Sequence, residues 1–96
     1  MNSFADSKQL TINAVGFQYR GRLPDDVRNG NLSLLPDPSN EYDANAIKLL
    51  SNEEHIAYIS AKQCEQVHKY IKSNPNHSVQ VIQIFPGSVQ LLLESP

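Results

Sequence analysis

Apolar residues along the 96-residue chain alternate with polar residues in short runs, a pattern typical of half-buried β-strands. The predicted strands cover residues 9–19, 31–35, 46–50, 55–59, 79–84 and 89–93. Clusters of Gly, Pro, Asn and Asp between these runs predict loops, of which residues 21–30 form a long one. Residues 51–54 predict a hairpin turn, so the third and fourth strands are expected to be antiparallel neighbours.

One helix is predicted directly after the fourth strand. Ser60 stands at the expected N-cap, and Gln63 three residues later completes a capping-box pattern. Apolar positions recur at helical spacing from Cys64 onward, which places His68 on the buried or half-buried face, and residues 73–76 end the helix. The chain is therefore predicted to be α+β and mostly β, a small barrel of about six strands with one main helix after strand four.

The composition indicates one globular domain, because 40% of the residues are hydrophobic and 19% are charged. We expect residues 1–8 to be a flexible polar lead-in and residues 9–96 to form a single domain. No apolar run approaches the roughly 20 residues of a membrane span, so no membrane partner is expected. The single cysteine, Cys64, cannot form an internal disulfide, which agrees with a cytoplasmic location.

The sequence lacks the usual parts of an enzyme. Its four glycines are too scattered for a phosphate-binding loop, and its three histidines lack metal-ligand spacing. Cys64 and His68 could meet on one helix face, but no third group is placed to orient them. We therefore expect no catalytic residue, no metal site and no cofactor. The net charge of −2 also counts against coating nucleic acid by bulk positive charge, so binding to nucleic acid would need a localised site.

Residues 37–47 carry the most specific pattern in the chain. Asn40, Asp43 and Asn45 can hydrogen-bond to nearby backbone groups and build a rigid turn that orients Tyr42 and Asp43. A fixed tyrosine ring offers a stacking face for a base, and a fixed carboxylate can accept a hydrogen bond from a sugar hydroxyl while repelling a phosphate. In the plainer interpretation, Tyr42 packs on the barrel and Asp43 only closes the turn.

The order of motifs resembles the HIRAN domain. The Asp-Pro-x-Asn-x-Tyr-Asp-x-Asn-Ala-Ile run of residues 37–47 follows Val-Gly-Phe-Gln-Tyr at 15–19 and precedes Ile-Ala-Tyr-Ile at 56–59. The resemblance covers roughly residues 10–71, and we expect it to extend to the closing strands. It implies an OB-like or SH3-like small barrel that captures the 3′ end of single-stranded DNA, as in the helicase-like remodelling proteins where this domain occurs. DNA repair is then the expected setting, by analogy with those relatives.

The resemblance also implies roles for individual residues. Tyr19 and Tyr42 match aromatic residues near the terminal nucleotides, and Asp43 matches the acid that contacts the terminal 3′-hydroxyl. Gln18 stands where the best-studied members have an arginine, and Tyr58 stands where they have a histidine. The remaining expected contacts are Ser60 and Lys62 at the start of the helix, with Arg20 and Arg22 as phosphate contacts that replace the missing charge.

Two classes of function stay open at this point. The first is a module for single-stranded DNA ends, working beside a helicase or nuclease that supplies any chemistry. The second is a protein-interaction module that binds a peptide in the barrel groove or along an edge strand. Positive charge around Tyr19 and Tyr42 would favour DNA, whereas an acidic or apolar surface would favour a peptide.

Overall fold

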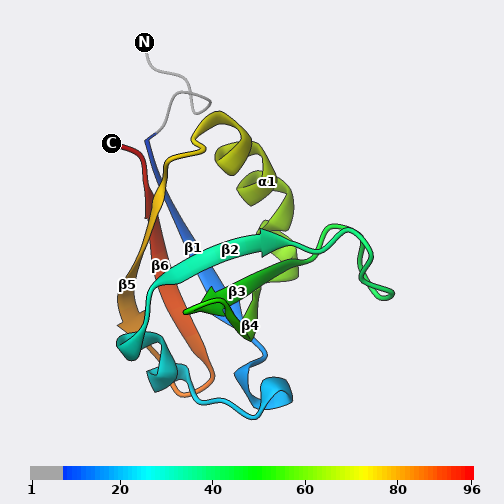
Figure 1. Ribbon diagram of the computed structural model, residues 1–96, viewed down its shortest axis with the longest axis vertical. Coiled ribbons are helices and arrows are strands. Elements are labelled where there is room, and N and C mark those ends of the chain that lie inside the picture. The colour runs from blue at the N-terminus through cyan, green and yellow to red at the C-terminus, as the bar shows by residue number, and fades with distance from the viewer. Residues whose placement is uncertain (1–7) are drawn as a thin grey trace.

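The computed structural model describes residues 8–96, which form one sheet of six strands and one main helix (Figure 1). The strands are β1 (Gln9–Val15), β2 (Leu32–Pro36), β3 (Ile47–Ser51), β4 (Glu54–Ile59), β5 (Ser78–Ile84) and β6 (Ser88–Glu94). The helix is α1 (Cys64–Ser73), and the short 3-10 helices are η2 (Phe17–Arg20), η3 (Pro24–Asn29) and η4 (Ala61–Gln63). The six strands and the helix after the fourth strand confirm the predicted fold class.

The strands form an antiparallel half-barrel in the order β2-β3-β4-β1-β6-β5. The β2–β3 layer crosses in front of β1 and β6 in Figure 1, and the two edge strands, β2 and β5, approach each other. The predicted hairpin between β3 and β4 is confirmed. Its central residues, Asn52 and Glu53, have positive φ angles of 51° and 70°, as the I′ type of hairpin turn requires.

The core is built from the inward-facing residues of the strands. Ile12 of β1 and Leu91 of β6 are fully buried, whereas their neighbours along each strand are more exposed. The apolar residues that alternate with polar ones in the sequence thus form one buried face of the sheet. Helix α1 completes the same hydrophobic cluster with the side chains of Cys64, Val67 and Tyr70.

The first strand is shorter than predicted, because β1 ends at Val15 rather than at Tyr19. Gly16 adopts a left-handed conformation with φ 78°, which glycine reaches without the steric cost that a side chain would add. The chain turns there into η2, and the side chain of Phe17 enters the core. The turn at Gly16 thereby takes Gln18 and Tyr19 out of the sheet.

The predicted loop over residues 21–30 contains the short helix η3. Pro24 opens this helix, and the Leu23 N–H donates to Asp26 Oδ2 at 2.9 Å. Val27 is buried in the core, so the segment is ordered against the barrel rather than extended as a loop. Alternation alone could not show this, because a single buried residue leaves no periodic pattern.

Strand β4 contains a β-bulge at Ile56. Ala57 and His55 pair with adjacent residues of β3, so Ile56 is an extra residue on β4. Both Ile56 and Ala57 are buried. Since side chains alternate between faces in a regular strand, the bulge brings His55 and Tyr58, three residues apart, to the same face of the sheet.

The capping box predicted at Ser60 and Gln63 does not form. The Ser60 side chain makes no cap hydrogen bond, and the turn η4 precedes α1. Gln63 Oε1 instead accepts a hydrogen bond from the Asn13 backbone N–H at 2.7 Å. A part-buried backbone donor needs a partner, and the Gln63 amide supplies it by joining the helix start to β1.

Most of the predicted lead-in, residues 1–7, lies outside the described residues. The carbonyl of Lys8 accepts hydrogen bonds from the Tyr70 hydroxyl at 2.6 Å and from the Ser95 N–H at 2.8 Å. The start of β1 is thus tied both to α1 and to the end of β6. Within residues 8–96, no helix is long and apolar enough to cross a membrane.

Candidate nucleic-acid interface

An exposed aromatic pair lies where η2 meets β4. Tyr19 is 80% exposed, and Tyr58 is half-buried. A Cβ atom added to Gly16 would lie 3.6 Å from Tyr19 Cδ2 and 3.8 Å from Tyr58 Cδ2, so both rings border the same glycine. We call these two rings the aromatic platform. Gly16 thus supplies the turn into η2 and lies next to both rings.

His55 lies beside Tyr58 of the platform. Its ring meets the Tyr58 ring edge-on, with centroids 4.6 Å apart and an interplanar angle of 88°. The atom Nε2 of His55 is buried and has no hydrogen-bond partner among the described residues. Burial lowers the pKa of His55, and the charges of Arg20 and Lys48 lower it further. The imidazole is therefore held neutral beside Tyr58.

Three polar residues in or just after η2 are expected to contact DNA, and they lie in different environments. Gln18 is exposed, and its side chain makes no hydrogen bond among residues 8–96. Arg20 Nε lies 3.5 Å from the His55 carbonyl oxygen, a long contact that leaves most of the guanidinium available. Arg22 Nη2 pairs with Glu54 Oε2 at 2.7 Å. Among the described residues, Arg20, unlike Arg22, thus makes no ion pair with a carboxylate.

The loop between β2 and β3 has the rigid turn that its sequence predicts. Asn40 Oδ1 accepts the backbone N–H groups of Tyr42 at 2.8 Å and Asp43 at 3.0 Å. Asn40 Nδ2 donates to Asp37 Oδ2 at 3.2 Å, and Asp43 Oδ1 accepts the Asn45 N–H at 2.9 Å. In this loop, side-chain oxygens thus accept the backbone N–H hydrogen bonds that backbone carbonyls accept in a helix or sheet.

Tyr42 does not pack on the barrel, because its side chain is 91% exposed. Asp43 is half-buried and closes the turn through Oδ1, while Oδ2 makes no hydrogen bond among the described residues. His68 Nε2 donates to the Asn45 carbonyl at 2.9 Å, which ties the loop to α1. His68 is half-buried and hydrogen-bonded, as the helical pattern predicts. We call residues 40–45 the Asp43 loop.

Cys64 and His68 do not form a reactive pair. The Cys64 Sγ atom lies 3.5 Å from the Ser60 carbonyl and 3.7 Å from the Ile59 carbonyl, whereas His68 bonds to the Asp43 loop. Burial raises the pKa of the Cys64 thiol, and the charge of Asp43 adds to that effect. A buried thiol that stays protonated is a poor nucleophile.

The start of the helix offers less to a phosphate than expected. The Ser60 N–H donates to the Asn13 carbonyl at 2.8 Å, so this donor is already used inside the protein. Ser60 is half-buried, whereas the Lys62 side chain is exposed on η4. Of the two residues predicted here, Lys62 is the one whose polar group faces solvent.

Five of the predicted residues therefore fall into two groups. Tyr19, Tyr58 and Arg20 gather at η2 and β4, and Tyr42 and Asp43 lie on the Asp43 loop. Within residues 8–96, no hydrogen bond, ion pair or ring contact joins the two groups. Sequence reasoning missed His55 and Lys48, since the β4 bulge and the β3–β4 register that place them near Tyr58 leave no sequence signal.

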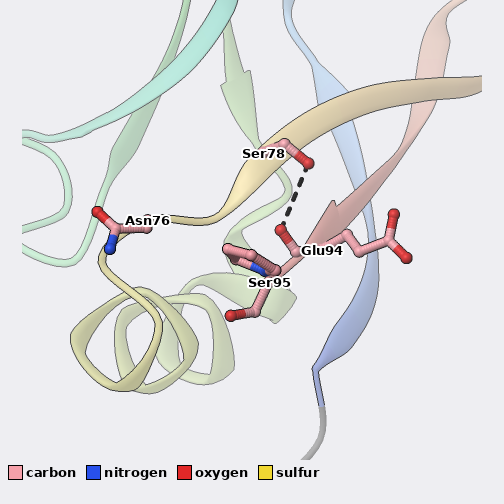
Figure 2. Close-up of a pocket in the computed structure, with 5 residues that line it drawn as sticks. Asn76, Ser78, Glu94 and Ser95 are labelled. Atoms are coloured by element: carbon pink, nitrogen blue, oxygen red, sulfur yellow. Dashed lines mark hydrogen bonds between the residues drawn. The ribbon is translucent and has the colours of Figure 1, made fainter.

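A separate pocket lies near the C-terminal end of the chain (Figure 2). It is lined by Asn76, Ser78, Glu94, Ser95 and Pro96. Ser78 Oγ donates to the Glu94 carbonyl there at 3.3 Å. This pocket contains none of the residues predicted to bind nucleic acid.

The fold is a small β half-barrel that exposes aromatic and charged side chains in two groups. The family model of the HIRAN domain matches residues 7–92, and the chain belongs to that family. A crystal structure of the HIRAN domain of human HLTF is similar, with 25% identity and a TM-score of 0.62 over 88% of this chain and 72% of that chain. No curated protein matches the sequence. HIRAN domains are nucleic-acid-binding modules, and they bind rather than catalyse.

Proposed function

We propose that this HIRAN domain binds the 3′ end of single-stranded DNA. Bases stack on Tyr19, Tyr58 and Tyr42, and the Asp43 carboxylate accepts a hydrogen bond from the terminal 3′-hydroxyl. Arg20, Lys62 and Gln18 contact the backbone of the same strand. Any helicase or nuclease activity belongs to a partner, and repair of DNA ends is the setting that fits this role.

The observation that carries the proposal is the pair of exposed tyrosines on backbone turns held by hydrogen bonds. Tyr19 and Tyr42 expose 80% and 91% of their surface, and their own N–H groups are bonded to the Gly16 carbonyl and to Asn40 Oδ1. Because the backbone of each tyrosine is already ordered, a base that stacks on the ring need not order the turn beneath it, and each stacked base contributes roughly 1–3 kcal/mol.

The cationic side chains near the aromatic platform favour the DNA backbone, whereas the carboxylates of the Asp43 loop favour a terminal hydroxyl. Burial lowers the pKa of His55 most, and the nearby charges of Arg20 and Lys48 lower it further, so two cationic side chains lie near the aromatic platform. Glu41 and Asp43 make the loop acidic. A negative group there repels a phosphate and accepts a hydroxyl proton, so the loop suits the end of a strand.

The test is fluorescence anisotropy at low salt with a short single-stranded DNA labelled at its 5′ end. The DNA carries a 3′-hydroxyl or a 3′-phosphate, and the protein is wild type, Asp43→Asn or Glu41→Gln. Both substitutions remove one negative charge from the same loop, so Glu41→Gln is the matched control. A hydrogen bond to a charged group contributes about 1.5–3 kcal/mol, so Asp43→Asn should weaken binding to the hydroxyl end by at least about tenfold.

Support requires that wild type and Glu41→Gln prefer the hydroxyl end and that Asp43→Asn loses this preference. Equal binding of wild type to both ends would remove the end-recognition mechanism and leave a general single-strand binder. Absence of binding to either DNA would overturn the proposal in favour of a peptide partner.

A further inference from the structure

Lys48 occupies the centre of a row of side chains that crosses the outer face of the sheet. In the strand register, Lys48 of β3 pairs with Leu35 of β2 and with Tyr58 of β4, and Tyr58 pairs with Val15 of β1. Residues paired in this way point to the same face, with Cβ atoms about 4.5–5.5 Å apart. Lys48 is therefore a direct neighbour of the aromatic platform.

Lys48 has no ion-pair partner in the part of the chain that the structure describes. Ion pairs among residues 8–96 hold Arg22, Arg28 and Lys69, each with a nearby carboxylate, and none involves Lys48. The pKa of His55 is lowered first by burial, then by Arg20 and then by Lys48, so the Lys48 charge reaches this side of the platform. A half-buried lysine without a carboxylate partner, beside an exposed aromatic surface, is complementary to a phosphate.

Lys48 also connects the two groups of predicted residues. The Asp43 carbonyl accepts the Ala46 N–H at 3.0 Å, and β3 begins at the next residue, Ile47. Lys48 follows directly and pairs with Tyr58. Because Lys48 is five positions after Asp43 in the chain, their Cα atoms lie at most about 18 Å apart. A strand whose terminal hydroxyl meets Asp43 would thus pass Lys48 on its way to the platform.

We propose that Lys48 is a phosphate-binding residue that guides single-stranded DNA from the Asp43 loop across β3 to the aromatic platform. The inference rests on the proposed function and adds the path of the strand and its polarity. The acidic loop holds the terminal hydroxyl, and Lys48 holds a phosphate on the 5′ side of that terminal nucleotide. The outer face of β2, β3 and β4 is then part of the interface.

The experiment measures the salt dependence of binding to 3′-hydroxyl DNA for wild type, Lys48→Gln, Lys48→Arg and Lys72→Gln. Lys72 is exposed in the last turn of α1 and makes no ion pair among the described residues, so it is the matched charge control. One phosphate contact to single-stranded DNA contributes a slope of about −0.7 in log K against log salt. Over a tenfold rise in salt, Lys48→Gln should therefore lose about fivefold less affinity than wild type.

A second arm replaces single phosphates of the DNA, one at a time from the 3′ end, with uncharged methylphosphonates. Wild type should lose affinity at one internal linkage near the 3′ end, and Lys48→Gln should be insensitive to that same replacement. Lys48→Arg should behave as wild type, because it keeps the charge. Thermal unfolding of each variant confirms that the protein analysed is folded.

The inference is overturned if Lys48→Gln and Lys72→Gln have the same slope, or if both Lys48→Gln and wild type respond to the same linkage. If wild type nevertheless prefers 3′-hydroxyl over 3′-phosphate DNA in the anisotropy titration, the proposed function stands. Loss of end preference in wild type itself would instead remove the proposed function, and the two failures are therefore distinguishable.

Discussion

Asn40→Ala tests whether the rigidity of the Asp43 loop is needed for binding. The change removes three hydrogen bonds, namely two from the backbone N–H groups of Tyr42 and Asp43 to Oδ1 and one from Nδ2 to Asp37. The N–H of Tyr42 is exposed, so water replaces that bond at little cost. The other two bonds are part-buried and contribute about 0.5–1.5 kcal/mol each, about 1–3 kcal/mol together.

This loss acts mainly on the order of the loop, because Asn40 is outside the hydrophobic core. DNA binding must then restore the conformation that the amide normally holds. Since 1.4 kcal/mol corresponds to a factor of ten, the lower part of the range predicts a roughly tenfold weaker Kd for single-stranded DNA. Hydrogen exchange at the Asp43 amide should accelerate by a similar factor.

The assay combines anisotropy titration with hydrogen exchange followed by NMR, and Ser39→Ala is the control. Ser39 is an exposed residue directly before the Asp43 loop, and its side chain makes no hydrogen bond among residues 8–96. Faster exchange in Asn40→Ala with an unchanged Kd would show that binding does not use the ordered loop. Unchanged exchange would refute the role of Asn40 in ordering it.

Three further predictions concern the barrel and the platform. Leu91→Ala should lower the free energy of unfolding by about 2–5 kcal/mol in urea titrations, and Ile82→Ala, at a half-exposed bulge, by less than about 1 kcal/mol. Gly16→Ala should lower it by about 1–2 kcal/mol because of the left-handed φ of 78°, whereas Gly87→Ala should change it by less than about 0.5 kcal/mol. Because burial lowers the pKa of His55, its neutral form stabilises the fold above pH 6.5, and this contribution is lost as the pH falls from 6.5 towards the lowered pKa. The Tm should therefore fall less on acidification in His55→Phe than in wild type, and an equal fall in both would contradict this assignment.

Local patterns in the sequence predicted the parts of the molecule that depend on neighbouring residues. Alternation predicted the strands because a half-buried strand needs apolar residues on one face only, as Ile12 and Leu91 illustrate. The turn of the Asp43 loop was predicted because Asn40 and Asp43 bond to backbone groups no more than three residues away. The predicted capping box does not form, because the Gln63 side chain makes a hydrogen bond to β1, which is far away in the sequence.

The shape of the binding surface was decided by the tertiary structure. His55 and Tyr58 share a face only because β4 carries a bulge, and a bulge depends on how β4 pairs with β3 rather than on its own sequence. The turn at Gly16 places Tyr19 outside the sheet. The register between β3 and β4 makes Lys48 a neighbour of Tyr58. The sequence by itself thus determined the strands, the helix and the local turn. Only the pairing of distant strands decided which side chains meet, because those contacts join residues that lie far apart along the chain.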